Sequence, residues 1–249
     1  MILSLTKRVT RALGLRVTRD RPSNRFQAID ECLQRIKTWG YQPEVVVDVG
    51  ANHGQFYRLI QRVFPDARCH LIEPQPACAS TLRCLTETNE RAEYHALALT
   101  EPGIPSVRLL GAGPSGGSTG AYVARPGECD PYEIVVQATT LDDLLSRRIE
   151  HDQRAFLKLD VESHELSVLL GSIATLGRIE VVLVEVSFFD VENRGIPSFF
   201  ELVGFLERQG FVLYDIASLA GRPRDMRLRM GDLLFVRNDS PLVADNAWE

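Results

Sequence analysis

The chain has 249 residues, of which 45% are hydrophobic, so it can bury one substantial core, as a single α/β domain does. Its formal net charge of -5 argues against a nucleic-acid-binding protein, because such proteins neutralise phosphates with a basic surface. Five cysteines without a C-x-x-C pair indicate neither a disulfide framework nor a zinc site, so we predict a reducing, cytoplasmic location.

Residues 1–25 form a basic N-terminal segment, with seven lysines or arginines against a single acid. Apolar residues lie at helical spacing among these cations: Ile2, Leu5, Val9 and Leu13. We expect either a basic amphipathic helix, in peripheral contact with the inner face of a membrane through residues 1–20, or a terminal helix packed loosely on the domain. Arginines interrupt every apolar run, so neither a signal peptide nor a membrane-spanning helix is expected.

A helix is predicted next, because Phe26, Ile29, Leu33 and Ile36 share one face and Gly40 ends the pattern. Beyond it, short apolar runs alternate with amphipathic helices, which indicates a parallel sheet covered on both faces. The last two runs have no helix between them, so we expect an antiparallel pair at one edge. The predicted strands are 44–50, 68–74, 92–100, 133–140, 155–161, 179–187, 211–216 and 232–237.

The turn after the first predicted strand has the features of a ligand site. Asp48 ends the strand, and Gly50 and Gly54 follow it, so the backbone can turn sharply and approach a ligand closely. Glu73 ends the second strand, where an acid can accept hydrogen bonds from both hydroxyls of a ribose. Taken singly, the glycines could form a plain connecting turn and Glu73 a solvated strand end. Together they predict an adenosine-containing ligand.

The glycine pattern counts against two common nucleotide sites. A dinucleotide site requires G-x-G-x-x-G, but Asn52 and Gln55 stand at its second and third glycine positions, and the G-K-[ST] ending of a P-loop is absent. A ligand with an adenosine and no phosphate remains, and S-adenosylmethionine meets that description. We predict that Asp48, Gly50, Asn52, Gly54 and Glu73 hold this cofactor.

Five blocks of the sequence together resemble the FkbM family of class I S-adenosylmethionine-dependent methyltransferases: DVGANHGQF, LIEPQP, TTLDDLL, KLDVESHELSVLLGS and VVLVEVS. The resemblance covers residues 44–237, the core of a domain predicted to span 26–249. It implies a Rossmann-like fold: a seven-stranded, mostly parallel sheet with an antiparallel edge strand and helices on both faces. It also implies O-methylation, with a sugar, glycolipid or other secondary metabolite as the acceptor. Ser163 stands where the family usually has glycine, which leaves the local backbone conformation open.

Carboxylates gather at the end of the predicted strand 155–161, which in this fold lies beside the transferred methyl group. An alcohol acceptor must lose its proton as the new bond forms, so we predict Asp160 as the base and Glu162 as the second candidate. The alternative is that both acids cap the following helix. Glu185 is predicted to line the acceptor site. The same three acids could bind a divalent cation, although we do not predict a metal.

Two further segments are expected to face the acceptor. Residues 111–131 are dense in glycine, proline and serine and read as a long loop, either a lid over the acceptor or a disordered segment. Between the last two strands, Arg222 and Arg224 belong to a cluster of four arginines. Their planar guanidinium groups suit phosphate or carboxylate, so we expect them to recognise an anionic small-molecule or glycan acceptor, unless the cluster is simply a solvated hairpin.

Two other functions remain open from the sequence. A nicotinamide-dependent oxidoreductase would use the same fold, although Asn52 and Gln55 count against it. A non-catalytic membrane-surface binding protein with this fold would explain the basic segment and Ser163.

Overall fold

The computed structural model describes residues 24–113, 119–150, 153–190 and 196–245 of the chain. The predicted basic segment, residues 1–25, lies almost entirely outside the described residues and stays a prediction. No helix in the described part of the chain is both long and apolar enough to cross a membrane.

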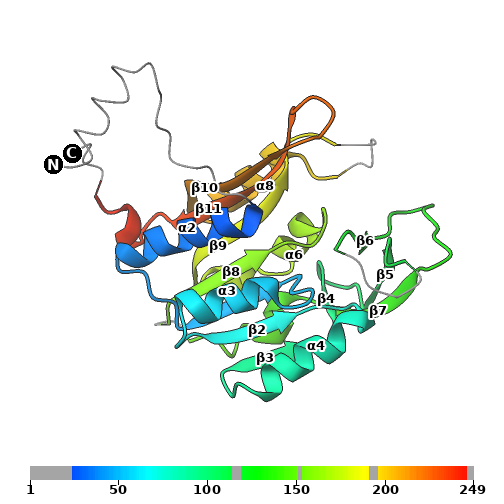
Figure 1. Ribbon diagram of the computed structural model, residues 1–249, viewed down its shortest axis with the longest axis horizontal. Coiled ribbons are helices and arrows are strands. Elements are labelled where there is room, and N and C mark those ends of the chain that lie inside the picture. Colours follow the sequence, from blue (N-terminus) through cyan, green and yellow to red (C-terminus); the bar gives the residue numbers. More distant parts are fainter. Residues whose placement is uncertain (1–23, 114–118, 151–152, 191–195, 246–249) are drawn as a thin grey trace, which may run out of the picture.

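The main sheet has seven strands in the order β10-β11-β9-β8-β1-β2-β3. Figure 1 shows how the strands lie side by side, from β10 at one edge to β3 at the other. β1, β2, β3, β8 and β9 are parallel, whereas β11 runs antiparallel to both of its neighbours, β9 and β10. The predicted Rossmann-like sheet is therefore confirmed, with the antiparallel strand one place in from the edge. The strands are β1 (Val45–Val49), β2 (Arg68–Ile72), β3 (Ala92–His95), β8 (Ala155–Leu159), β9 (Ile179–Ser187), β10 (Phe211–Gly221) and β11 (Leu228–Arg237).

Helices cover both faces of this sheet. The buried apolar residues of α2, α3 and α4 pack on one face, and those of α5, α6, α7 and α8 pack on the other. Both faces of β1 are thus covered, which explains why its apolar run is continuous rather than alternating. The helices are α2 (Arg25–Thr38), α3 (Gln55–Val63), α4 (Pro76–Glu87), α5 (Leu141–Leu145), α6 (Glu165–Leu170), α7 (Ile173–Leu176) and α8 (Phe199–Arg208), and a short 3-10 helix, η2 (Pro241–Val243), follows β11.

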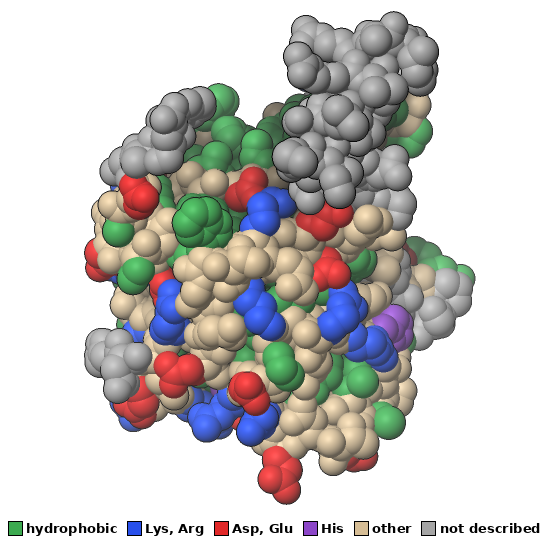
Figure 2. Space-filling view, turned by 60° about the vertical axis from the view of Figure 1, so that its left-hand side comes forward, with side chains coloured by type: hydrophobic (Ala, Val, Ile, Leu, Met, Phe, Trp, Pro, Cys, Tyr) green, Lys and Arg blue, Asp and Glu red, His purple; other side chains and the backbone are tan. Residues whose placement is uncertain are grey.

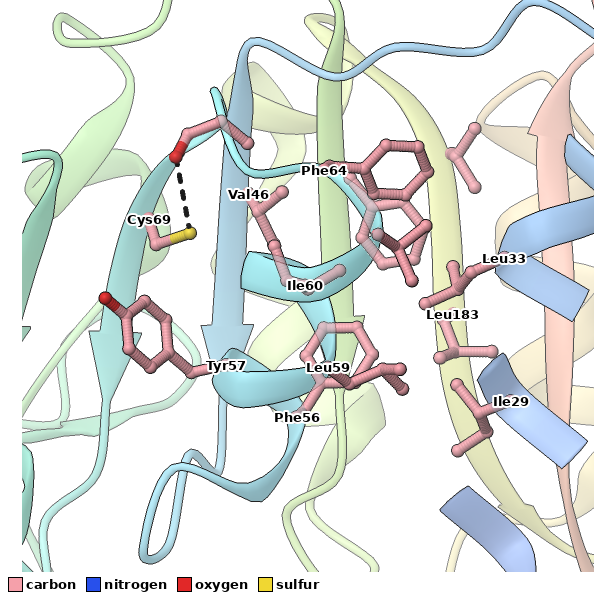
Figure 3. Packing of buried hydrophobic residues seen from close by; sticks show 14 of the residues in the cluster. Ile29, Leu33, Val46, Phe56, Tyr57, Leu59, Ile60, Phe64, Cys69 and Leu183 are labelled. Carbon is pink, nitrogen blue, oxygen red and sulfur yellow. Dashed lines mark hydrogen bonds between the residues drawn. The ribbon is translucent and has the colours of Figure 1, made fainter. Parts of the chain in front are cut away.

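The predicted helix after the basic segment is α2, and its first turn matters for the site. The Asn24 side chain caps it by accepting a hydrogen bond from the Gln27 N–H at 2.9 Å. Figure 3 shows Ile29 and Leu33 of α2 lying near Leu183 of β9, in the same hydrophobic cluster. This packing fixes α2 against the sheet, and the cap starts the helix at Arg25.

A second sheet of four short strands lies beside the main one, in the order β4-β7-β5-β6. The apolar content of residues 133–140 predicts a strand of the main sheet, and this prediction is wrong. These residues form β7, which pairs with β4 and β5 of the second sheet. Residues in β7 alternate between half-buried and exposed, unlike the fully buried β1 and β8, because one face of β7 meets solvent. The strands are β4 (Ala98–Leu99), β5 (Ser106–Leu110), β6 (Tyr122–Val123) and β7 (Ile134–Thr139).

Candidate active site

A cavity of about 480 Å³ lies at the carboxyl ends of the parallel strands, a size typical of small-molecule sites. The strand order reverses between β1 and β8, which is where ligands bind in open α/β sheets. The second sheet closes the other side of the cavity through residues 97–99 and 119–123. Residues 119–123 of the predicted loop 111–131 therefore line the site, and two of them form β6.

The turn after β1 forms the floor of the cavity. Gly50 has a φ of +77°, and a Cβ added to it would lie 1.8 Å from the Asp160 carbonyl oxygen. Only glycine allows the β1 and β8 loops to approach so closely. Asn52 also has a positive φ, of 48°, a conformation that asparagine tolerates better than most residues. The turn thus exposes its backbone to the cavity at Gly50 and Asn52.

Glu73 follows β2 and reaches the same turn from the side. One of its carboxylate oxygens accepts a hydrogen bond from the Asn52 N–H and the other from the Gln75 N–H, both at 2.9 Å. The side chain is buried, and burial raises the pKa of Glu73, opposed by these two N–H donors. Its carboxylate is therefore held in one orientation at the wall of the cavity, with lone pairs left for a ligand.

Two of the predicted cofactor residues do not line the cavity. Asp48 lies inside β1, fully buried, where it forms an ion pair with the Lys158 ammonium at 3.0 Å. Lys158 in turn donates a hydrogen bond to the Gly50 carbonyl at 2.8 Å, so Asp48 supports the turn from beneath. Gly54 begins α3, and a Cβ there would meet Leu85 of α4 at 2.5 Å. Its glycine serves helix packing.

Arg25, at the start of α2, pairs with three acidic residues in the half of the cavity opposite Glu73. Its guanidinium donates two hydrogen bonds to Asp232 of β11, at 2.7 and 2.5 Å. The same Nη2 atom lies 3.0 Å from an oxygen of Asp160 and 2.8 Å from one of Glu185. Glu185 and Asp232 face each other directly across β9 and β11, a pairing of like charges that costs stability unless a cation or a proton relieves it. Arg25 supplies the cation.

Protonation of Glu185 itself also relieves this pairing of like charges. Burial and the neighbouring negative charge of Asp160 raise the pKa of Glu185 to about 9, although Arg25 acts in the opposite direction. Glu185 therefore keeps its proton at neutral pH, while Asp160 contacts both the Arg25 guanidinium and, at 3.7 Å, the Lys158 ammonium. Of the two carboxyl groups, Asp160 is the one placed to accept a proton.

The loop after β8 adopts a strained conformation. Glu162 and Ser163 both have positive φ angles, of 52° and 76°, in the left-handed region that glycine favours. Ser163 keeps this conformation without being glycine. Buried Glu165 stabilises it, since one of its oxygens accepts hydrogen bonds from the N–H groups of Val161 at 3.0 Å and Ser163 at 3.3 Å. Glu165, rather than Asp160 or Glu162, thus caps this segment, and both of those acids line the cavity.

The arginine hairpin reaches the correct edge of the sheet but not through the predicted residues. Met230 of β11 pairs with Ser187, so the hairpin emerges at the carboxyl end of β9, as expected. Arg222, however, forms an ion pair with Asp225, and neither Arg222 nor Arg224 lines the cavity. Arg229, from the same cluster, does line it. The prediction of Arg222 and Arg224 as direct acceptor ligands is not supported by this geometry.

Comparison with known proteins decides the family. A model of the methyltransferase FkbM domain matches residues 48–213, about two thirds of the chain. The chain belongs to the FkbM methyltransferase family. A search of curated proteins finds no similar sequence. The match to a methyltransferase family leaves the oxidoreductase alternative without support.

Several solved methyltransferase structures are similar to this FkbM methyltransferase, at low identity. One is a Burkholderia thailandensis 1,6-didemethyltoxoflavin-N1-methyltransferase with its substrate and S-adenosylhomocysteine bound (12% identity, 86% of this chain, 79% of that chain, TM-score 0.48). Another is the Geobacter metallireducens precorrin-6y C5,15-methyltransferase (13%, 89%, 93%, 0.43). A third is a Streptococcus thermophilus rRNA methylase (11%, 89%, 99%, 0.46).

Three residues of this FkbM site escaped sequence analysis. The sequence could have pointed to Lys158, because it stands two positions before Asp160 in the predicted strand 155–161 and is therefore expected on the same side of the sheet. The sequence could also have pointed to Asp232, because this acid begins the apolar run DLLFVR. No sequence pattern points to Arg25, since its partners lie more than a hundred residues away in sequence. These contacts also remove the support for a cation held by Asp160, Glu162 and Glu185, because Arg25 already pairs with two of them.

Proposed function

We propose that this protein transfers a methyl group from S-adenosylmethionine to a hydroxyl oxygen of a sugar, glycolipid or other secondary metabolite. The observation that carries the proposal is that one cavity joins the Gly50 turn and Glu73 on one side to Asp160 on the other. A nucleoside and a hydroxyl acceptor can thus meet in one enclosed space.

The residues around Glu73 fit the nucleoside part of the cofactor. The Glu73 oxygens, each fixed by one backbone N–H, keep lone pairs for the two ribose hydroxyls. Gly50 and Asn52 line this half of the cavity, and the described residues around them include no cluster of cations that would suit a phosphate. When bound, S-adenosylmethionine supplies an electrophilic methyl group, and the protein has to align the acceptor with it.

Asp160 acts as the base in this proposal. It lies between the cofactor half and the acceptor half of the cavity, and Arg25 and Lys158 fix its position. An acceptor hydroxyl that donates a hydrogen bond to Asp160 loses its proton to that carboxylate as the new bond forms. Glu162 lines the same wall and is the second candidate.

The acceptor half combines acids with one reachable arginine. Glu185, protonated at neutral pH, can donate a hydrogen bond to an oxygen of the acceptor. Arg229 lines the wall and is exposed, so we assign to it the contact with an anionic group that the sequence suggested for Arg222 and Arg224. On the face shown in Figure 2, basic and acidic side chains lie interspersed, so that face carries no extended basic surface for nucleic acid.

The test uses labelled S-adenosylmethionine and a panel of acceptors: free sugars, nucleotide sugars, lipid-linked saccharides and matched amines. Label is expected in a hydroxyl-bearing acceptor, with the new methyl carbon bonded to oxygen by NMR. Asp160→Asn should lower kcat by about 10²-fold to 10⁴-fold and leave S-adenosylhomocysteine affinity unchanged, because it removes the base and keeps the shape. Asp66→Asn, at an exposed position outside the cavity, is the matched control. Methylation of amines alone would overturn the proposal.

A further inference from the structure

Away from the cavity, three metal-ligating side chains meet between β2 and β3, at the edge of the main sheet. His70 pairs in register with Glu93, and His95 stands two residues further along β3, so the three share one face of the sheet. The His70 Nδ1 lies 3.2 Å from the His95 Nε2. One carboxylate oxygen of Glu93, Oε2, lies 3.6 Å from the His70 Nδ1, and the other, Oε1, lies 3.8 Å from the His95 Nε2.

We propose that His70, Glu93 and His95 bind a divalent transition-metal ion of the zinc class. Tetrahedral zinc holds nitrogen and oxygen ligands at about 2.0–2.2 Å, which sets neighbouring ligand atoms roughly 3.3 Å apart. The two imidazole nitrogens already have this spacing, and one ligand atom from each of the three residues lies within 4.8 Å of the others. Two imidazoles and one carboxylate form a recognised zinc ligand set, with the fourth position left to water.

Each histidine offers one ring nitrogen to the cluster, Nδ1 from His70 and Nε2 from His95. Glu93 is half-exposed and gives the ion a route from solvent, whereas the two histidines are buried.

The surrounding groups orient the ligands. Arg148, which follows α5, donates to both Glu93 oxygens at 2.9 Å and fixes that carboxylate against the histidines. Such outer hydrogen bonds are typical of metal-binding carboxylates. The backbone carbonyl of His95 also accepts a hydrogen bond from the Glu73 N–H at 3.2 Å. A metal that ties β3 to β2 would therefore also brace the strand end that presents Glu73.

The experiment measures zinc binding by the untagged full chain after removal of metal with EDTA. Zinc is titrated in competition with a chromophoric chelator, and cobalt is titrated separately to record its visible spectrum. Glu93→Gln and His95→Gln are the test variants. Glu90→Gln is the matched control, since it changes an exposed acid three residues away and leaves the cluster intact. Circular dichroism and S-adenosylhomocysteine binding verify that each variant is folded.

We expect one zinc per chain in the wild type and in Glu90→Gln, with at least tenfold weaker binding in each test variant. Cobalt is expected to give the intense visible bands of a tetrahedral site, and these should be lost in Glu93→Gln. Absence of zinc binding by the wild type overturns the proposal and leaves a histidine pair joined by a hydrogen bond. Wild-type zinc affinity in both test variants also overturns it, because the ion then lies elsewhere.

Discussion

Replacing Gly50 with alanine tests how closely the β1 turn must approach the loop after β8. The new Cβ would lie 1.8 Å from the Asp160 carbonyl oxygen, whereas real Cβ contacts essentially never fall below 3.0 Å. The two loops would have to separate by more than 1 Å. A left-handed φ costs alanine about 1–2 kcal/mol, and overpacking costs about 1–3 kcal/mol, so the free energy of unfolding should fall by about 2–5 kcal/mol.

Gly103→Ala is the matched control, because Gly103 has a φ of +87° and nothing lies within 4 Å of its added Cβ. The free energy of unfolding of Gly103→Ala should fall only by the cost of the left-handed φ, about 1–2 kcal/mol. Urea denaturation measures both stabilities, and calorimetry with S-adenosylhomocysteine measures whether displaced loops weaken binding in Gly50→Ala alone. Equal stability losses and unchanged binding in both variants would refute the close approach as a requirement of the site.

Three further changes probe the acidic half of the cavity and its loop. Arg25→Ala leaves buried carboxylates without their shared cation and should lower the free energy of unfolding by about 3 kcal/mol in urea; unchanged stability would contradict the pairing. Because the folded chain keeps the Glu185 proton up to about pH 9 and the unfolded chain releases it near 4.5, stability should fall as pH rises between these values. Denaturation at stepped pH should show a flatter slope for Glu185→Gln, and the same slope would count against a raised pKa. Ser163→Gly relieves a left-handed φ of 76° and should raise stability by about 1 kcal/mol; a loss would mean that the serine side chain compensates.

The architecture could be predicted from sequence because its signals are local. Continuous apolar runs marked the buried parallel strands, and the spacing from Gly50 to Glu73 marked two neighbouring strand ends that line one cavity. The second sheet was harder to predict, because β7 and the strands beside it are short and their placement depends on tertiary contacts. Its alternating burial distinguishes it only in the structure.

Asp160, Glu162 and Glu185 were predicted to line the site, and they do, but the ion pairs that surround them could not be predicted from the sequence. Asp48 was assigned to the cofactor by its position near a strand end, yet its partner Lys158 draws it beneath the turn. Arg222 was assigned to the acceptor by its charge, yet a neighbouring acid, Asp225, occupies it. Arg25 stands at the end of the predicted basic segment, residues 1–25, and only the folded chain brings it to Asp160.

The most direct test of the adenosine site is calorimetry with S-adenosylhomocysteine. The wild-type chain should bind one molecule, and Glu73→Ala should weaken binding at least tenfold, because hydrogen bonds to a charged group contribute about 1.5–3 kcal/mol. Glu87→Ala, at the exposed end of α4, is the control and should bind as the wild type does. No binding by the wild type, or equal binding by Glu73→Ala, would contradict the assignment of this cavity to an adenosine cofactor.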